Sequence, residues 1–397
     1  MLDVILYVIQ NVGLKKRDGG FCSRGDIYPL FHGKHGWKRV KYHRSYVYIA
    51  CFIFGIMDRS NSEGAVMDSK PYRAKITGTG SYLPEKRITN ADLEKMVETN
   101  DEWIQQRTGI VERRMAAPEQ ATSDLALEAS RIAIADAGLT PQDIDQIIVA
   151  TVTPDTIFPA TACRLQFMLG CRQILAFDLA AACSGFIYAL SIARTAIEAG
   201  TAKHILVVGA ETLTRFTDYT DRGTCILFGD GAGAVVLSQT TEGNAGIIDT
   251  HNASDGSGAD LMILPGIGSR NSPTTETLDA GLQYIKLNGR AVYKHAISKI
   301  VSLVNESLAR CHLSQDDINL IIPHQMNARI IESAAKHLDI PLEKVFVNID
   351  KYGNTSAATI PIAIDEAHRQ GRVKEGDLVV LVAFGGGMTW ASALLRW

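Results

Sequence analysis

Short apolar runs alternate with longer segments of helical periodicity from Lys75 to the C-terminus. Continuous apolar runs of four or five residues are typical of strands whose sheet is covered on both faces. The pattern predicts, in order, a strand at 75–80, helices that begin at Asn90 and Asp101, a helix capped by Ser123 that ends at Ala137, a strand at 147–150, a helix over 162–169, a strand at 176–179, a helix over 185–199, and strands at 205–208 and 228–237. This alternation indicates an α/β protein.

The same order of elements repeats about 171 residues further along the chain. The matching segments are strands at 318–322, 345–348 and 378–382 and helices over 328–338 and 355–371, preceded by a strand at 246–248, a polar excursion at 269–277 and a helix over 289–311. Because this offset is far longer than a solenoid repeat, we interpret it as two copies of one domain. In this register Cys183 superposes on Gly353 and Asn354, where a strand turns into a wholly apolar helix.

Residues 1–66 lack a sustained period and hold ten Lys/Arg against five Asp/Glu. We therefore predict an N-terminal extension at 1–70 and two halves at 71–243 and 244–397. The extension is a disordered or loosely docked segment, a targeting segment, or a stretch that is not translated because synthesis starts at Met67, which is the account we favour. Its apolar run Tyr46–Met57 is shorter than the roughly 20 residues that a membrane span needs.

Composition narrows the classes of function. The formal net charge is −3, so the chain has no global basic field that would hold nucleic acid. The seven cysteines are scattered without a CxxC pair, which argues against a disulfide scaffold or a structural zinc site and fits a reducing compartment such as the cytoplasm. Each cysteine is then either a small buried hydrophobe or a nucleophile.

Cys183 is the strongest candidate nucleophile. It lies in the segment Asp-Leu-Ala-Ala-Ala-Cys-Ser-Gly-Phe, at the predicted first turn of an apolar helix. Unpaired backbone N–H groups and the helix dipole at such a position favour thiolate over thiol. Taken alone, the segment fits a buried structural cysteine better than a nucleophile. The presence of His324 and Asn354, described next, favours the interpretation of Cys183 as a nucleophile.

His324 follows the apolar strand at 318–322, and Asn354 lies in the segment Tyr-Gly-Asn-Thr-Ser-Ala-Ala. In α/β proteins, ligands bind at the carboxyl ends of the strands. A nucleophile, a base or donor, and an amide donor at three strand ends form a plausible catalytic set. The structural alternatives are a hydrogen-bonded histidine and an Asn that only caps a helix.

Two glycine-rich segments complete the motifs. Residues 384–389, Phe-Gly-Gly-Gly-Met-Thr, suit an oxyanion hole or a tight turn, and they lack the Lys-Ser/Thr of a phosphate loop. Residues 229–233 resemble a dinucleotide fingerprint only loosely, and we interpret these small residues as close packing of the strand against another sheet.

From about residue 72 to Trp397 the chain resembles β-ketoacyl-acyl-carrier-protein synthase III, the initiating condensing enzyme of type II fatty acid synthesis. The motifs that carry the resemblance are collinear: Ile76–Pro84, Asp101–Gly109, Asp178–Phe186, Asp221–Thr224, Gly229–Gly233, His324-Gln325, Gly353–Ala358 and Phe384–Trp390. The resemblance implies a thiolase fold of two pseudo-symmetric halves in five α/β/α/β/α layers, as an obligate homodimer.

The resemblance also implies roles for single residues. It makes Cys183 the acyl-accepting nucleophile, His324 and Asn354 its partners, and the backbone amides of Cys183 and Gly386 the oxyanion hole. It further implies CoA binding by Trp103, Arg107, Arg222 and Asn327, carrier-protein docking at Lys294 and Arg329, and a Phe158 that reaches across the dimer into the partner's acyl pocket. Met326 stands where the family usually has Ala, and we expect it to narrow the pantetheine channel.

The implied reaction joins a short acyl-CoA, most simply acetyl-CoA, to malonyl-acyl-carrier protein through an acyl-cysteine, with loss of CO₂. It needs no metal and no cofactor, because the CoA thioester is a substrate. A thiolase would need a second cysteine near Gly386, and an elongating synthase a histidine at Asn354. A type III polyketide-synthase-like or other CoA-thioester condensing enzyme remains the alternative. We expect no nucleic-acid or membrane partner and a cytoplasmic location, or the plastid stroma if the extension is a transit peptide. The sequence leaves the primer open.

Overall fold

We describe the protein from a computed structural model, which describes residues 30–33, 36–39 and 72–397. The chain divides into two compact units, Met1–Ser69 and Lys70–Trp397. In the first unit, β1 (Leu30–Gly33) pairs antiparallel with β2 (Gly36–Arg39). Four-residue strands are too short to show a period, so the sequence pattern did not predict this hairpin. The apolar run Tyr46–Met57 lies outside the described residues.

The second unit contains two main sheets. The first has the strand order β3-β9-β8-β6-β7, with β6 parallel to β7 and β8 and with β9 antiparallel to β3 and β8. Its strands are β3 (Arg73–Tyr82), β6 (Gln146–Ala150), β7 (Leu175–Leu179), β8 (His204–Thr212) and β9 (Asp230–Thr240). The second has the order β10-β15-β14-β13, and its only parallel pair is β13 with β14. Its strands are β10 (Gly246–Ser254), β13 (Leu320–Pro323), β14 (Leu378–Gly385) and β15 (Thr389–Arg396).

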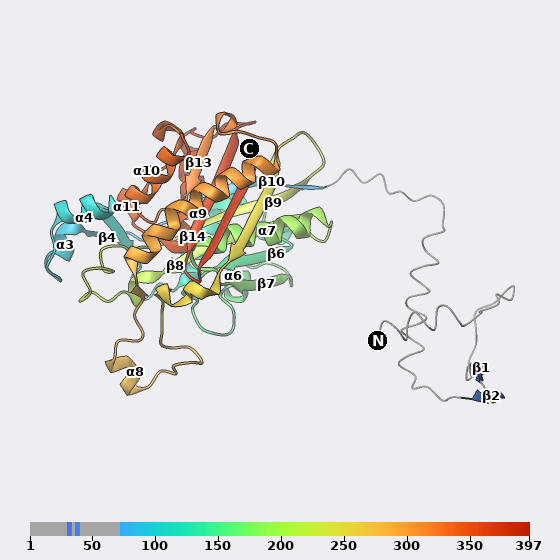
Figure 1. Ribbon diagram of the computed structural model, residues 1–397, viewed down its shortest axis with the longest axis horizontal. Helices are drawn as coiled ribbons and strands as arrows, with labels where there is room; N and C mark the ends of the chain where they lie inside the picture. The colour runs from blue at the N-terminus through green and yellow to red at the C-terminus, as the bar shows by residue number, and fades with distance from the viewer. Residues whose placement is uncertain (1–29, 34–35, 40–71) are drawn as a thin grey trace. The chain divides into compact units, whose positions relative to one another are not determined.

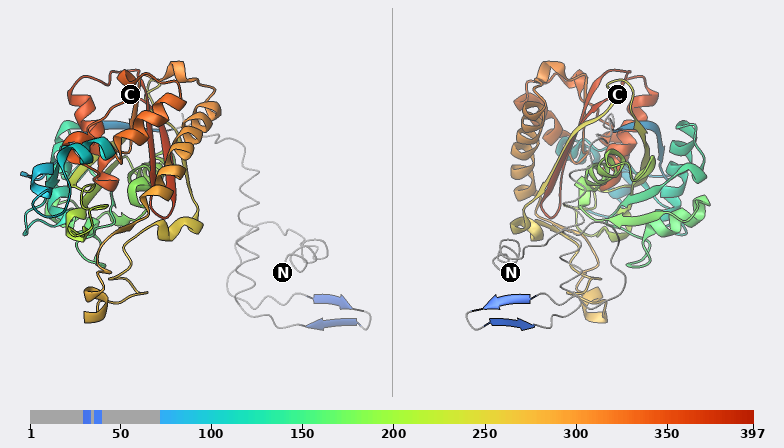
Figure 2. Two further views of the ribbon diagram at one scale, coloured as in Figure 1. Left: turned by 60° about the vertical axis from the view of Figure 1, so that its left-hand side comes forward. Right: turned by 90° about the vertical axis from the view of Figure 1, so that its right-hand side faces the viewer.

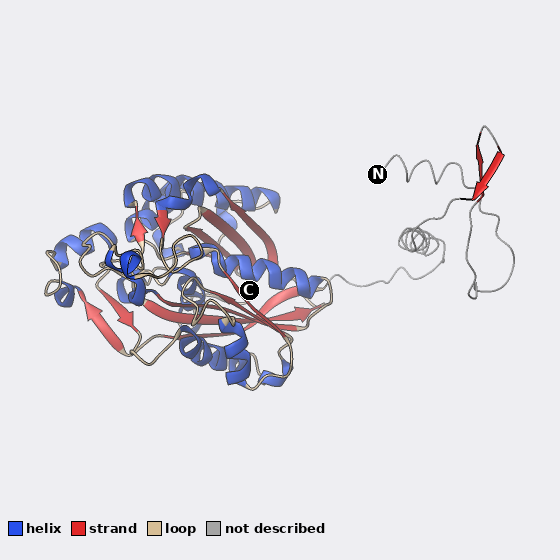
Figure 3. Ribbon diagram, turned by 90° about the horizontal axis from the view of Figure 1, so that it is seen from below, coloured by secondary structure: helices blue, strands red, loops and turns tan. Residues whose placement is uncertain are grey.

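Helices cover both faces of each sheet, and Figure 3 shows the alternating layers. The outer face of the first sheet packs against α5 (Thr122–Asp136) and α6 (Thr161–Leu169). Between the sheets lie α7 (Gly185–Glu198) and α12 (Thr359–Arg369), which share one apolar core with strands of both. The outer face of the second sheet packs against α9 (Gly289–Arg310) and α10 (Ala328–His337) (Figure 1). This is the predicted five-layered α/β/α/β/α arrangement.

Smaller elements surround these layers. They are α3 (Asn90–Leu93), α4 (Asp101–Thr108), the hairpin of β4 (Lys86–Thr89) and β5 (Glu112–Met115), the pair β11 (Met262–Ile263) and β12 (Lys286–Leu287), α8 (Thr275–Asp279) and α11 (Ile349–Tyr352). The predicted polar excursion at 269–277 forms the segment around α8, which projects away from the sheets (Figure 2). One-turn 3₁₀ helices precede the two central helices: η3 (Ala182–Ser184) leads into α7, and η8 (Ser356–Ala358) leads into α12.

Most predicted elements are present, and three details are wrong. The helix expected to begin at Ser123 is capped at Ala121, whose N–H donates to the Asp124 carboxylate. Ser123 instead donates its hydroxyl to Asp155. The glycines at 231 and 233 pack against helix α12 rather than against another sheet, because a Cβ on Gly233 would lie 2.5 Å from the Ile362 nitrogen.

The third difference concerns the strand predicted at 345–348, which is reduced to a single bridge between Val345 and Ile321. The buried Gln325 side chain takes the place of the ladder. Its amide nitrogen donates to the carbonyl of Phe346, and its amide oxygen accepts from the N–H of Asn348. These backbone groups are therefore satisfied without a neighbouring strand.

Candidate active site

Cys183 lies on the 3₁₀ turn η3, directly before α7, and its side chain is buried. The preceding residue, Ala182, has a φ of 47°, a left-handed conformation that is costly for a residue with a side chain. The glycine loop presses against this turn, since a Cβ on Gly385 would lie only 2.8 Å from the Cys183 nitrogen. Gly385 is therefore required for the loop to reach the cysteine.

Three hydrogen-bond donors lower the pKa of Cys183: the Ser356 hydroxyl and the backbone N–H groups of Cys183 and Gly386. The two amides are those that the resemblance assigns to the oxyanion hole. Burial outweighs these donors and raises the pKa of Cys183 to about 12, and the negative charge of Glu211 adds to the rise. The expectation that the helix start favours the thiolate is therefore not met in this closed site, where the sulfur is a thiol.

His324 follows β13, as predicted, and is 1% exposed. Its Nδ1 lies 2.7 Å from the hydroxyl of Thr359, at the start of α12. Among the residues that the structure describes, Nε2 has no hydrogen-bond partner. Burial lowers the pKa of His324 to about 3, so the ring is neutral at physiological pH and Nε2 is the atom left to meet a substrate.

The backbone of Asn354 is hydrogen-bonded to the residues that directly precede β9. Its N–H donates to the carbonyl of Leu227, and its carbonyl accepts from the N–H of Gly229. The side-chain oxygen accepts from the N–H of Ser356 at 2.8 Å, which is a local turn rather than the cap of α12. With the oxygen engaged, Nδ2 is the donor that Asn354 offers.

Ser356 connects the three candidate catalytic residues, and the sequence reasoning missed it. Its hydroxyl contacts Cys183, its N–H contacts Asn354, and its carbonyl accepts from Thr359, the hydroxyl that also contacts His324. Its φ of 48° matches that of Ala182. A serine followed by two alanines carries no signal for this role, because the left-handed turn depends on how η8 packs. Glu211, described below, was missed for the same reason.

The residues expected to bind CoA gather on one surface. The guanidinium groups of Arg222 and Arg107 lie 4.5 and 5.2 Å from the centre of the Trp103 ring. Asn327 caps α10, and its Nδ2 donates to the carbonyl of Arg107 at 2.9 Å, which ties the end of α4 to the start of α10. An aromatic face flanked by two cations suits a purine next to phosphates.

The two basic residues expected to dock the carrier protein lie on neighbouring helices. Lys294, on α9, and Arg329, on α10, are both exposed. The Arg329 guanidinium lies 5.9 Å from the ring of Tyr293, the neighbour of Lys294. Met326 is partly buried against the outer core of the second half, and its effect on a pantetheine channel stays a prediction.

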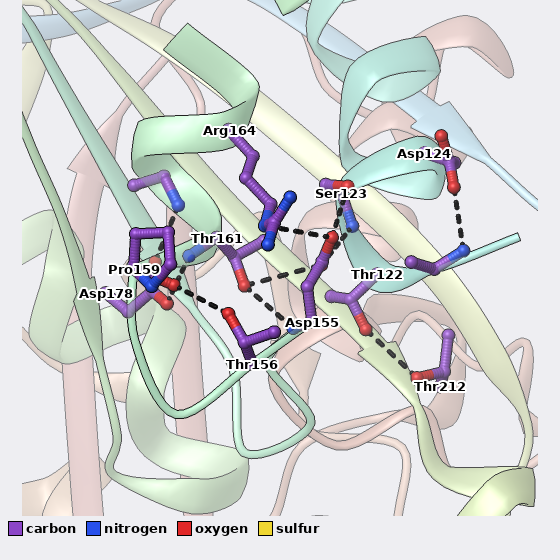
Figure 4. Close-up of polar contacts among 12 residues, drawn as sticks. Thr122, Ser123, Asp124, Asp155, Thr156, Pro159, Thr161, Arg164, Asp178 and Thr212 are labelled. Atoms are coloured by element: carbon purple, nitrogen blue, oxygen red, sulfur yellow. Dashed lines mark hydrogen bonds and ion pairs between the residues drawn. The ribbon is translucent and has the colours of Figure 1, made fainter. Parts of the chain in front are cut away.

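Phe158 is 84% exposed on a loop between β6 and α6 whose ends are fixed by carboxylates (Figure 4). Asp155 accepts from the N–H and hydroxyl of Ser123 at 2.9 and 2.6 Å. Asp178 accepts from the N–H groups of Thr161 and Ala162, the first residues of α6. The loop therefore presents Phe158 outward from a fixed base.

Within residues 30–33, 36–39 and 72–397, no cluster of three or more His, Cys, Asp or Glu side chains is arranged to hold a metal ion. In the same part of the chain, no helix has both the length and the apolar character needed to cross a membrane.

Comparison with known proteins agrees with this geometry. The family model 3-oxoacyl-[acyl-carrier-protein (ACP)] synthase III matches residues 177–256, and the model of its C-terminal part matches residues 308–397. The β-ketoacyl-[acyl-carrier-protein] synthase III of Caldanaerobacter subterraneus is 53% identical over 324 residues, which cover 82% of this chain and 98% of the relative. The chain belongs to the β-ketoacyl-acyl-carrier-protein synthase III family.

Further relatives and solved structures agree. The synthase III of Xanthomonas campestris pv. campestris is 52% identical over 83% of this chain and its own full length. The crystal structure of 3-oxoacyl-[acyl-carrier-protein] synthase III from Aquifex aeolicus has a TM-score of 0.76 and 47% identity, and covers 82% of this chain and all of its own. As a member of this synthase III family, the chain has the thiolase fold and is an acyltransferase of the condensing type.

Proposed function

We propose that this synthase III homologue condenses a short acyl-CoA with malonyl-acyl-carrier protein to give 3-oxoacyl-acyl-carrier protein, CoA and CO₂, and so initiates fatty acid synthesis. The observation that carries the proposal is the turn at Ser356, which links Cys183, His324 and Asn354 beside two backbone amides. Acetyl-CoA is the simplest primer. The relatives' names, which specify β-ketoacyl-[acyl-carrier-protein] synthase III, support the carrier-protein product.

The first step is acyl transfer to Cys183. Once Cys183 has lost its proton, its thiolate attacks the thioester carbonyl, CoA leaves as its thiolate, and an acyl-cysteine remains. The tetrahedral intermediate carries a negative oxygen, and the N–H groups of Cys183 and Gly386 are the donors that stabilise it. Both belong to the backbone, so no side chain has to reorganise as the charge develops.

The second step is decarboxylation. Malonyl-carrier protein loses CO₂ and leaves an enolate, whose oxygen accepts hydrogen bonds from His324 Nε2 and Asn354 Nδ2. For Nε2 to donate, Nδ1 must accept the proton of the Thr359 hydroxyl, which lies 2.7 Å away. The hydroxyl has one proton, so in this step it turns from the Ser356 carbonyl, 3.0 Å away, to Nδ1. The enolate carbon then attacks the acyl group, and the Cys183 thiolate leaves. The step is driven by loss of CO₂ and calls on no cofactor.

The substrate surfaces follow from the same geometry. Trp103, Arg107, Arg222 and Asn327 bind the nucleotide end of CoA, with the adenine entering between the Trp103 ring and the Arg222 guanidinium, which stack at 4.5 Å without it. Lys294 and Arg329 hold the acidic surface of the carrier protein.

The preferred extender tests the proposal. With acetyl-CoA as primer, we expect malonyl-carrier protein to give 3-oxobutanoyl-carrier protein far faster than malonyl-CoA gives any condensed product. A preference for malonyl-CoA would favour a polyketide-synthase-like enzyme instead. One structural neighbour, the priming β-ketosynthase of the R1128 polyketide pathway, has a TM-score of 0.76 but only 33% identity over 82% of this chain. The higher identity to synthase III relatives argues against that alternative.

We include a homodimer in the proposal because β7 is an outer strand of its sheet and is surrounded by exposed apolar side chains. Ile157, Phe158 and Phe167 are more than 80% exposed, and Leu175 on β7 is 56% exposed. An open strand edge with such neighbours is typical of a surface that pairs with a second copy. A two-fold axis at β7 would join the sheet that contains β7 to the same sheet of a second subunit. It would also carry each Phe158 toward the partner's acyl pocket.

Phe167→Glu tests the dimer. A charge on this side of α6 should convert the protein to monomers in sedimentation velocity, while Leu342→Glu, a 53% exposed apolar residue of the other half, should leave dimers intact. Dimers in both variants would rule out the β7 surface.

The cytoplasmic location and the predicted halves at 71–243 and 244–397 also remain part of this proposal.

A further inference from the structure

Glu211 is a wholly buried carboxyl group that the reaction above does not use. It lies near the carboxyl end of β8 and is 0% exposed. The Thr153 hydroxyl donates to it at 2.6 Å, and the Thr151 hydroxyl and the Val152 N–H donate at 3.2 and 3.1 Å. A buried carboxyl group with several fixed donors is costly to maintain and calls for an explanation.

The strand direction points Glu211 toward the catalytic turn. Gly209 faces η8, because a Cβ there would lie 2.2 Å from the carbonyl oxygen of Ala357. Side chains alternate along a strand, so Glu211, two residues further on, lies on the same face. Ser356 begins η8, on that same side of β8, and its hydroxyl acts as a hydrogen-bond donor that lowers the pKa of both Glu211 and Cys183.

We propose that Glu211 accepts the thiol proton of Cys183 through the Ser356 hydroxyl when the acyl group is transferred. The S–H bond of Cys183 breaks as its proton passes to the Ser356 oxygen, and the Ser356 proton passes to a Glu211 oxygen. The products are a thiolate that accepts from Ser356 and a neutral carboxylic acid. Glu211 acts through Ser356 and does not touch the sulfur, so it is a positioning residue.

The neighbouring groups support this assignment. Burial raises the pKa of Glu211 to about 7, whereas the pKa of His324 is lowered to about 3, so Glu211 is the better proton acceptor at neutral pH. The other elements against Glu211 contribute hydroxyl and amide groups at 151–153 and Ser356. The nearby carboxylates face their own donors: Asp155 accepts from Ser123, Asp178 from the start of α6, and Asp230 from Ala116 and Thr214.

This inference rests on the proposed role of Cys183 as the nucleophile, and one experiment separates the two. Single-turnover acetylation by acetyl-CoA is followed from pH 5.5 to 9.5, with intact and peptide mass locating the acetyl group. In the wild-type protein the rate should rise with a midpoint near pH 7, as Glu211 ionises. No acetyl group on Cys183 would overturn the proposed function itself.

Glu211→Gln keeps the shape and removes the acceptor, so the midpoint should move up by about one pH unit or more and the rate at pH 7 should fall about tenfold. Ser356→Ala should give the same profile, because it removes the hydroxyl that links Glu211 to Cys183. The variant should fold, because Ala182 shows that alanine can adopt this left-handed backbone. The double variant should be no slower than either single variant, as expected for two members of one relay.

The opposite shift would overturn the inference. If Glu211 acted only as a nearby negative charge, its removal would ease ionisation of Cys183 and move the midpoint down. An unchanged midpoint would also contradict the relay. Asp230→Asn is the matched control, a buried carboxylate that should lower the melting temperature without moving the midpoint. If Glu211→Gln does not fold, an unshifted profile in Ser356→Ala overturns the relay by itself.

Discussion

The turns that precede the two central helices have the same backbone and different chemistry. Ala182 begins η3 with a φ of 47°, and Ser356 begins η8 with a φ of 48°. The first turn carries the proposed nucleophile Cys183. The second carries Ser356, whose hydroxyl lowers the pKa of Cys183, whose N–H donates to Asn354 and whose carbonyl accepts from Thr359. In the proposed mechanism, one half of the duplicated fold supplies the reacting atom, and the other supplies the hydrogen bonds around it.

The comparison also corrects the register of the repeat. The matching left-handed residues at 182 and 356 lie 174 residues apart, as do the starts of β6 and β13 and of β8 and β14. Cys183 therefore corresponds to Ala357, not to Gly353 and Asn354. Asn354 has no catalytic counterpart in the first half, because it lies before the turn where the first half has an alanine, Ala180.

Removing the proposed nucleophile of the first turn should have the largest effect. Cys183→Ser should lower condensation by about 10⁴-fold or more, because a buried hydroxyl ionises far less readily than a thiol. Steady-state release of CoA from acetyl-CoA and malonyl-carrier protein measures this. Cys311→Ser, a partly buried cysteine of α9's end, is the control and should keep the full rate. Comparable loss in both variants would contradict the assignment.

The donors of the second half should affect the second step more than the first. His324→Ala and Asn354→Ala should each lower malonyl decarboxylation by about 100- to 1000-fold while acyl transfer to Cys183 largely persists. Release of labelled CO₂ and acetylation of the enzyme are measured separately. If both variants decarboxylate at the wild-type rate, the two residues do not stabilise the enolate.

The contact between Thr359 and His324 should have a smaller effect. Thr359→Val keeps the shape but removes the proton that Nδ1 accepts, so decarboxylation should fall by about five- to tenfold, in line with one lost hydrogen bond. Thr359→Ser keeps the hydroxyl and should retain the wild-type rate. Equal rates in the valine and serine variants would show that this contact does not set the tautomer.

The smallest effect should come from outside the two halves. A protein that starts at Met67 should condense its substrates at the full-length rate, and its melting temperature should lie within about 2 °C of that of the full chain. The reason is that a relative aligned over 98% of its own length matches only 82% of this chain. A larger fall in melting temperature, or aggregation, would show that residues 1–66 support the fold.

Much of this architecture follows from the sequence pattern. Continuous apolar runs placed the parallel strands, and the apolar helices after Cys183 and Asn354 indicated the buried central layer. The pattern failed where side chains replace backbone pairing, as Gln325 does beside β13. It also missed Ser356 and Glu211, because a hydroxyl and a carboxyl group gain their roles from packing between elements that are distant in sequence.

The central claim is that Cys183 forms the acyl-enzyme at the meeting point of the two turns. Peptide mass mapping after incubation with isotope-labelled acetyl-CoA tests it most directly. The account predicts one acetyl group per chain on the peptide that contains Cys183, which disappears when malonyl-carrier protein is added. Label on another of the cysteines, or no covalent label in a protein that still condenses its substrates, would contradict it.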